Sequence, residues 1–349
     1  MKTKLFILLA IIGGALAVFL MAGVSDKPVT YTGQKFNGLS FVAPPRPITA
    51  AEVDSMARVH ANWITLMPYG FVREGGAEFQ YRVEGDTTQG HQWWGESPEG
   101  IRTCIRLAKA KGIHVMLKPH MWYGRGNFTG DFTLSNEADW KRFEETFGAY
   151  ILQYAHLAQE EGAEAVCIAT EMHTMVAERP EFWLKLIKEI RTFYTGKLTY
   201  AENWDKYQDV PFWEQLDFIG VDAYFPLSTA QNPDVASLTK AWLPHIKELK
   251  KSSAKFHKPI LFTEYGYRSC DFATDKPWET DYNKPYNEAL QAAAYEALYQ
   301  SVWQEPWMAG GFAWKWFPHK KSHERSRDAF CMQHKLAEHV MATQYAKNE

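Results

Sequence analysis

The sequence predicts an α/β fold, a single (β/α)8 or TIM barrel. Short apolar segments of strand character alternate with amphipathic helical segments eight times over residues 35–349. Most of the strand segments are apolar along their length, which is typical of parallel strands covered on both faces. The alternative, an open doubly wound sheet, would place a glycine-rich phosphate turn after the first strand. The segment FNGLSFVAPPRP contains no such turn.

Each unit has its own local signals. Thr49 and Glu52 are spaced as a capping box at the start of the first helix, and Ser97 followed by Pro98 opens the second. A polar and aromatic stretch, 69–96, separates these two units. The strands are predicted at 36–41, 62–68, 113–119, 163–171, 197–204, 217–225, 259–266 and 310–317. The helices are predicted at 48–61, 97–112, 136–162, 180–194, 235–256, 286–304 and 335–345, with a short helical piece at 210–216. Pro244 is expected to kink or restart the helix that contains it.

The N-terminus has the pattern of an export signal. Lys2 and Lys4 precede an uncharged run, 6–23, that ends before Asp26. The run has about the minimum length of a membrane span, so 1–24 is interpreted as an uncleaved anchor in preference to a signal peptide cleaved near Ala17. We expect residues 25–34 to form a linker and residues 35–349 to form the barrel. We expect a periplasmic or extracellular protein that contacts a membrane only through this segment.

Composition narrows the function. The net charge of −3 and the lack of a basic stripe argue against nucleic acid as a partner. Fourteen tryptophans exceed what a core of this size needs, and flat aromatic rings stack well on sugars. The spacing of the four cysteines matches no metal site, and their apolar surroundings favour buried free thiols. We expect no metal or cofactor, and a monomer.

Polar and aromatic residues gather at the C-terminal ends of the predicted strands, where barrels of this class place their active sites. They are Lys118, His120 and Trp122 after the third strand; Glu171 after the fourth; Asn203 and Trp204 after the fifth; Asp222 and Tyr224 after the sixth; Glu264 after the seventh; and Trp314 and Trp316 on the eighth. Strand alternation predicts that Ala169 shares a face with Glu171, Phe262 with Glu264, and Asp222 with Tyr224.

Two of these residues suggest a reaction. Glu171 and Glu264 are separated by 264 − 171 = 93 residues, or three units of about 31 residues, the size expected of one βα repeat. Strands four and seven lie on opposite sides of a barrel, so the two side chains converge over its mouth. A lone glutamate at a strand end is usually a solvated cap, but a pair of carboxyls across a cleft is what glycoside hydrolysis requires.

The sequence resembles glycoside hydrolase family 113, a family of endo-β-1,4-mannanases in clan A of the glycoside hydrolases. The resemblance runs from residue 35 to the C-terminus and is carried by GLSF, IATEMHTM, FIGVDAYFPL, ILFTEYGYRS and GGFAWKWFP. It implies a retaining mechanism with Glu171 as acid/base and Glu264 as nucleophile, assisted by Tyr224. It also implies that Trp314 is the platform under the sugar at the cleavage point. Many clan members have asparagine before the acid/base glutamate, whereas this chain has Thr170.

Other residues are expected to bind substrate. Lys118, His120, Asn203 and Asp222 are predicted to bind sugar hydroxyls, and Asn203 or His120 would replace the contact that Thr170 cannot make. Trp122, Trp204 and Trp316 are predicted to form outer sugar subsites. Two other functions remain open: hydrolysis of another β-linked glycan or oligosaccharide with the same glutamate pair, and non-catalytic glycan binding on the same barrel.

Overall fold

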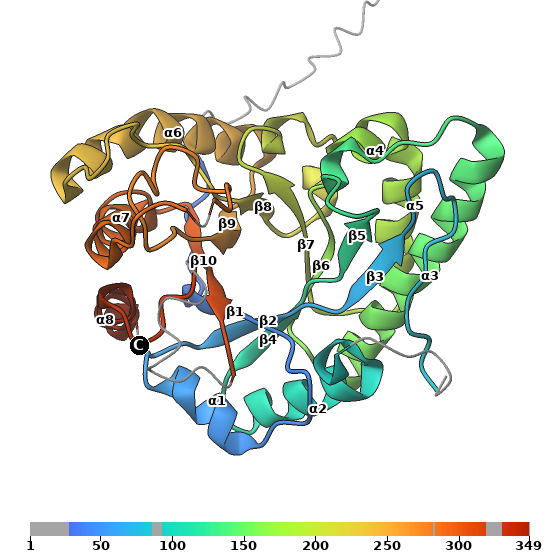
Figure 1. Cartoon of the computed structure of the whole chain (residues 1–349). Helices are drawn as coiled ribbons and strands as arrows, with labels where there is room; N and C mark the ends of the chain where they lie inside the picture. The colour runs from blue at the N-terminus through green and yellow to red at the C-terminus, as the bar shows by residue number, and fades with distance from the viewer. Residues whose placement is uncertain (1–27, 86–92, 282, 319–329, 349) are drawn as a thin grey trace, which may run out of the picture.

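The barrel is closed. The computed structural model describes residues 28–85, 93–281, 283–318 and 330–348 (Figure 1). Eight parallel strands pair in the order β1-β10-β9-β8-β7-β6-β4-β2 and return to β1. Their bounds are β1 Phe36–Phe41, β2 Trp63–Leu66, β4 His114–Leu117, β6 Ala165–Thr170, β7 Lys197–Asn203, β8 Ile219–Asp222, β9 Ile260–Tyr265 and β10 Met308–Trp316. The predicted (β/α)8 class is confirmed.

The helices form the outer layer around the strands (Figure 1). They are α1 Ala50–Ala57, α2 Pro98–Lys109, α3 Glu137–Glu161, α4 His173–Glu178, α5 Pro180–Arg191, α6 Val235–Phe256, α7 Glu288–Gln300 and α8 Leu336–Tyr345. The capping box of Thr49 and Glu52 is present, and the Ser97 side chain caps α2 as predicted. Pro244 lies inside one continuous helix, so it does not start a new one.

The apolar core has two parts, one inside the barrel and one around it. Together they leave the C-terminal end of the barrel for polar side chains. Inside the barrel, toward the N-terminal ends of the strands, aromatic side chains form a plug in which Phe36 stacks on Trp63 with ring centroids 4.2 Å apart. A larger apolar layer lies between the strands and the helices. All four cysteines are buried free thiols, as expected.

A small ribbon lies beside the barrel. The strand β3, Tyr69–Val72, pairs in parallel with β5, His120–Tyr123, to the right of the barrel in Figure 1. The sequence predicted no strand in the polar and aromatic stretch 69–96, and it predicted that His120 and Trp122 follow a barrel strand. Both residues instead stand on this ribbon.

A β-bulge in β9 changes which way its side chains face. Val221 of β8 pairs with Phe262, but the next residue, Asp222, pairs with Glu264, so β9 holds one extra residue at Thr263. Phe262 packs outward on Trp242 of α6, with ring centroids 6.2 Å apart. The prediction that Phe262 and Glu264 share a face is therefore wrong, because one inserted residue reverses the alternation.

Bulges also occur in β6 and β10. In β6 the register shifts between Cys167 and Thr170, so regular alternation ends before Glu171. In β10, Ala313 pairs with Leu39 and Trp316 with Phe41, which leaves two residues of β10 opposite one of β1. Trp316 thus faces outward, is fully buried, and donates a hydrogen bond from Nε1 to Ser55 Oγ at 3.2 Å. Its predicted role in an outer subsite is wrong.

The predicted leader, 1–24, and the first part of the linker lie outside the described residues. Within the part of the chain that the structure describes, no helix is both long and apolar enough to cross a membrane.

Close packing between β7 and β8 gives a stability prediction. A Cβ at Gly220 would lie 2.0 Å from the Tyr200 carbonyl oxygen, whereas a Cβ at Gly148 of α3 would lie 3.6 Å from Phe182. We predict that Gly220→Ala lowers the free energy of unfolding by about 1–3 kcal/mol. The control Gly148→Ala should raise it by about 0.5–1 kcal/mol, because alanine favours a helix. Urea denaturation of both variants checks this, and equal effects would contradict it.

Candidate active site

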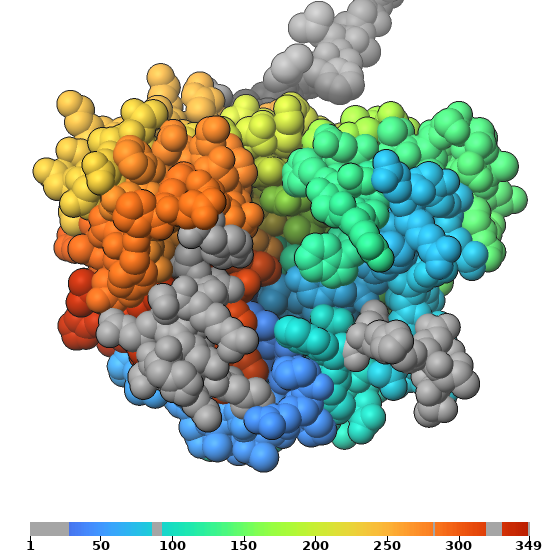
Figure 2. Space-filling model, viewed as in Figure 1, coloured from blue at the N-terminus to red at the C-terminus, as the bar shows by residue number. Residues whose placement is uncertain are grey.

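A cavity of about 610 Å³ opens at the C-terminal ends of the strands. Figure 2 shows this face hollowed in the middle, between the orange segments that follow β9 and the green segment that follows β5. The residues that line the cavity are Phe128, Glu171, Asn203, Trp204, Asp205, Tyr224, Glu264, Trp278, Thr280, Trp314 and Phe330. Both predicted catalytic glutamates therefore line one cavity. Two hollows of similar size, between α3 and α5 and at the N-terminal ends of the strands, lie away from them.

A buried lysine joins two carboxylates at the bottom of the site. Lys118 follows β4 and has no exposed surface. Its Nζ lies 2.5 Å from Glu264 Oε1 and 3.0 Å from Asp222 Oδ1. Burial lowers the pKa of Lys118, but the two carboxylates outweigh it and raise that pKa above its ordinary value. Lys118 therefore stays charged. Its positive charge in turn offsets the repulsion between the two carboxylates.

Further donors complete the surroundings of Glu264. The Tyr224 hydroxyl donates to Glu264 Oε2 at 2.8 Å, and Thr263 Oγ1 donates to Asp222 Oδ1 at 2.7 Å. Asp222 and Tyr224 thus lie on one side of their strand end, as predicted. Burial and the charge of Asp222 raise the pKa of Glu264 to about 7, while Lys118 and Tyr224 act in the opposite direction by stabilising the carboxylate.

Glu171 has different surroundings. It follows the β6 bulge with a left-handed φ of 50°, and its peptide N–H donates to the Ala201 carbonyl at 2.7 Å. Among the described residues, no side chain donates a hydrogen bond to its carboxyl. Burial, together with the charges of Asp222 and Glu264, raises the pKa of Glu171 well above its ordinary value. One lysine already serves two carboxylates, so a third negative charge is costly and Glu171 keeps its proton.

Asn203 and His120 can each offer a donor to a ligand. Asn203 lines the cavity, and its Oδ1 accepts the Trp204 N–H at 2.8 Å, so its Nδ2 can still donate to a ligand. His120 Nε2 is buried without a hydrogen-bond partner in the described chain and lies 3.9 Å from Glu264 Oε1. Burial, with the Lys118 charge, lowers the pKa of His120 well below its ordinary value, so the ring is neutral. A neutral imidazole can donate to or accept from a hydroxyl.

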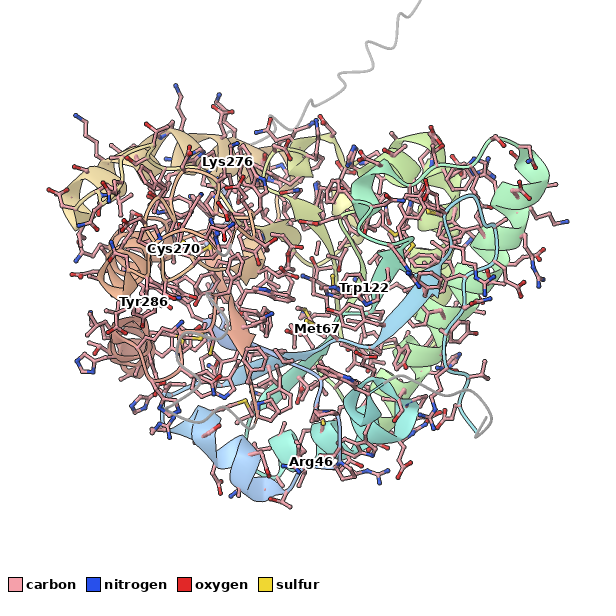
Figure 3. The ribbon with its side chains drawn as sticks, viewed as in Figure 1. Arg46, Met67, Trp122, Cys270, Lys276 and Tyr286 are labelled. Carbon is pink, nitrogen blue, oxygen red and sulfur yellow. The ribbon has the colours of Figure 1, made fainter. Side chains whose placement is uncertain are left out.

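Aromatic side chains extend the site on two sides. Trp204 stacks on Trp278, with centroids 5.5 Å apart, within the cavity. On the ribbon, Trp122 stacks on Tyr69 with centroids 5.2 Å apart and leaves 59% of its surface exposed. Figure 3 shows Trp122 near the middle of the view, across from Cys270 and Lys276. Sequence reasoning missed Trp278, Phe128 and Phe330, which stand on loops without a periodic pattern.

The described part of the chain contains no group of three His, Cys, Asp or Glu side chains that could hold a metal ion. What the arrangement offers is acid–base and nucleophilic chemistry by carboxyls. A carboxyl that keeps its proton faces the same cavity as a carboxylate held by a lysine and a tyrosine, which is the division of roles that glycosidases use.

Comparison with known proteins identifies the family. The model of glycoside hydrolase family 113 matches residues 45–335. The chain belongs to this family and is a glycoside hydrolase. A comparison with curated protein sequences finds no match for this family 113 chain.

Solved structures agree with the fold. The family 113 β-mannanase AaManA from Alicyclobacillus acidocaldarius, solved in complex with ManMIm, has a TM-score of 0.79 and 24% identity, with 92% of this chain and 100% of that chain covered. Another family 113 β-1,4-mannanase, solved as a complex, has a TM-score of 0.76 and 19% identity, with 90% and 99% covered. A β-glucuronidase from Ruminococcus gnavus has a TM-score of 0.57 and 12% identity, with 85% of this chain and 46% of that chain covered.

The structure brings together most of the predicted site residues of this family 113 enzyme. Glu171, Glu264, Tyr224, Trp314, Asn203 and Trp204 line the cavity, and His120 lies beside it. Lys118 and Asp222 are fully buried beneath the cavity, and Lys118 binds both Asp222 and Glu264. Their predicted contact with sugar hydroxyls is therefore replaced by a role in holding Glu264, which is direct for Lys118 and acts through Lys118 for Asp222.

The lysine gives a pH prediction. Removing an opposite charge raises a carboxyl pKa by about 1–3 units, so Lys118→Met should move the acidic limb of the kcat/KM profile upward by at least about one unit. At neutral pH, kcat/KM should fall at least about fivefold, because the ionised fraction of Glu264 falls when a pKa of about 7 rises by one unit or more. The control is Lys35→Met, which loses a hydrogen bond from Nζ to the Met308 carbonyl at the N-terminal end of the barrel. An unshifted acidic limb in Lys118→Met would refute the role of this cation.

Proposed function

We propose that this enzyme is a retaining endo-β-1,4-mannanase that acts on mannan-type polysaccharides and their oligosaccharides. The observation that carries the proposal is the pair of glutamates in one cavity, with Lys118 on Glu264 and no donor on Glu171 among the described residues. Family membership supports the mannan substrate, since the similar family 113 structures are described as β-mannanases.

Each glutamate takes one role in each of two steps. In the first, the Glu264 carboxylate attacks the anomeric carbon while Glu171 gives its proton to the departing glycosidic oxygen. In the second, Glu171 removes a proton from water, which attacks the same carbon and releases Glu264 with overall retention. Tyr224 and Lys118 stabilise the Glu264 carboxylate before attack and receive it again after release.

The mannose hydroxyl next to the anomeric carbon needs a partner. Thr170 stands before the acid/base residue, and its Oγ1 is buried without a hydrogen-bond partner in the described residues. Asn203 Nδ2 and His120 Nε2 are our candidates for binding this hydroxyl. The alternative of a different β-linked glycan uses the same glutamates and differs in this contact.

Several sugars of a chain would bind at once. Trp314 would stack under the sugar at the cleavage point, Trp204 and Trp278 would bind sugars on one side, and Trp122 would bind on the ribbon side. Platforms on both sides of the glutamates suit an enzyme that cuts within a chain. Export through residues 1–24, as signal or anchor, would bring the enzyme to polymers outside the cytoplasm.

Substrate and mechanism can be tested together. We predict that the fragment from residue 30 hydrolyses β-1,4-mannan and glucomannan, and that Glu264→Gln and Glu171→Gln each lower kcat on mannan by at least about a thousandfold. Reducing-sugar release from mannan, glucomannan, cellulose and xylan is the measurement. Cleavage of cellulose or xylan alone would replace mannan as substrate, and wild-type activity in Glu264→Gln would remove this residue as nucleophile. Binding without cleavage by the wild type would support the glycan-binding alternative.

The stacked pair of Trp204 and Trp278 predicts an effect on KM that depends on the length of the substrate. Trp278 is 44% exposed and stacks on Trp204, so Trp278→Ala should raise KM for mannohexaose about three- to tenfold and leave kcat/KM for an aryl mannobioside nearly unchanged. A matched control is Leu243→Ala, which removes an exposed apolar side chain from α6. Equal losses on long and short substrates would exclude a distal sugar subsite at Trp278.

A further inference from the structure

Glu202 is a buried carboxyl that the proposed reaction does not use. Ala201 belongs to the cluster inside the barrel, whereas Tyr200 belongs to the layer under the helices, and Glu202 lies on the same face as Tyr200. It has no exposed surface and does not line the cavity. Burial raises the pKa of Glu202 to about 7, and hydrogen bonds from Asn203 and Tyr200 act against this rise. A group that costs this much to bury needs a structural or functional reason.

Both oxygens of Glu202 accept a hydrogen bond. Oε1 accepts the peptide N–H of Asn203 at 2.8 Å, and Oε2 accepts the Tyr200 hydroxyl at 2.8 Å. The first bond fixes the peptide of a residue that lines the cavity. The second fixes the rotation of the Tyr200 hydroxyl, because its one proton points to Glu202 and its lone pairs point away from it.

The oriented Tyr200 hydroxyl holds the peptide of Met172, the residue that follows Glu171. The Tyr200 oxygen accepts the peptide N–H of Met172 at 2.7 Å, in a buried position. The preceding N–H, that of Glu171, donates to the Ala201 carbonyl at 2.7 Å. Two successive peptides are therefore anchored on β7, on either side of a glutamate whose φ of 50° is uncommon for a residue with a side chain.

We propose that Tyr200 and Glu202 are positioning residues that hold Glu171 in the orientation needed to protonate the departing oxygen. This inference rests on the proposed function, since it assigns the acid/base role to Glu171. Glu202 acts through Tyr200 on Met172, and neither side chain touches the substrate. Without the Tyr200 oxygen, the Met172 N–H loses its acceptor, and the turn that carries Glu171 is no longer held on that side.

The test compares leaving groups. Protonation by the acid/base matters for a poor leaving group and little for a good one, so kcat/KM is measured on phenyl and dinitrophenyl β-mannobiosides. Tyr200→Phe should lose about tenfold on the phenyl substrate, the value of one hydrogen bond, and stay close to wild type on the dinitrophenyl substrate. Glu202→Gln, which keeps the size of the side chain, should show the same selectivity with a smaller loss.

Tyr194→Phe is the matched control. The Tyr194 hydroxyl also makes a buried hydrogen bond, to the Ala163 carbonyl at 2.8 Å, but at the opposite end of the strands. It should lower thermal stability and leave both substrates unaffected. Equal losses on the two substrates in Tyr200→Phe and Glu202→Gln, or no loss in either variant, would overturn the inference.

The same two substrates distinguish failure of the proposed function from failure of the positioning role. Glu171→Ala should show the same preference for the dinitrophenyl substrate in a stronger form. If the wild type cleaves neither mannobioside, the mannan substrate of the proposed function is wrong; if Glu171→Ala loses equally on both, the acid/base assignment is wrong. If Glu171→Ala behaves as expected and the Tyr200 and Glu202 variants do not, only the positioning role is lost.

Discussion

The contact between Lys118, Asp222 and Glu264 is the interaction on which the rest of the site depends. One buried cation serves two carboxylates that come from β8 and β9, while the lysine follows β4. Without that cation, two negative charges inside the barrel would repel each other at close range in a medium of low polarity. Because Lys118 is already paired with Asp222 and Glu264, its charge does not compensate a third carboxylate, and Glu171 remains protonated. Glu264 and Glu171 thus acquire their different protonation states from one ion cluster.

Strand irregularities decide which side chains reach that cluster. In β9 the extra residue lets both Thr263 and Glu264 approach Asp222, while Phe262 remains packed against α6. In β10 the bulge leaves Trp314 in the cavity and turns Trp316 onto α1. Bulges are found next to active sites because they re-aim single side chains without disturbing the rest of a sheet. In this barrel they occur on three strands that carry residues of the site.

The sequence was sufficient for the barrel and for the glutamate pair. Eight repeats of apolar strand and amphipathic helix leave few alternatives, and the spacing of Glu171 and Glu264 follows from the size of the repeat. The outward position of Trp316 could not be predicted. A bulge is a change of register between two paired strands, whereas the alternation of side chains is a property of one strand alone. The ribbon of β3 and β5 was missed for a related reason. Each strand has four residues and follows a proline, so neither is long enough to show a period.

Covalent trapping tests most directly whether Glu264, held by Lys118, is the nucleophile. The wild-type protein would be inactivated with a fluorinated β-mannobiosyl fluoride, which forms the glycosyl-enzyme intermediate and slows its hydrolysis. Mass spectrometry of the digested protein should then show one disaccharide on the peptide that contains Glu264, and none in Glu264→Gln. An adduct on Glu171 or Asp222, with Glu264 unmodified, would contradict the roles assigned to all three carboxyls.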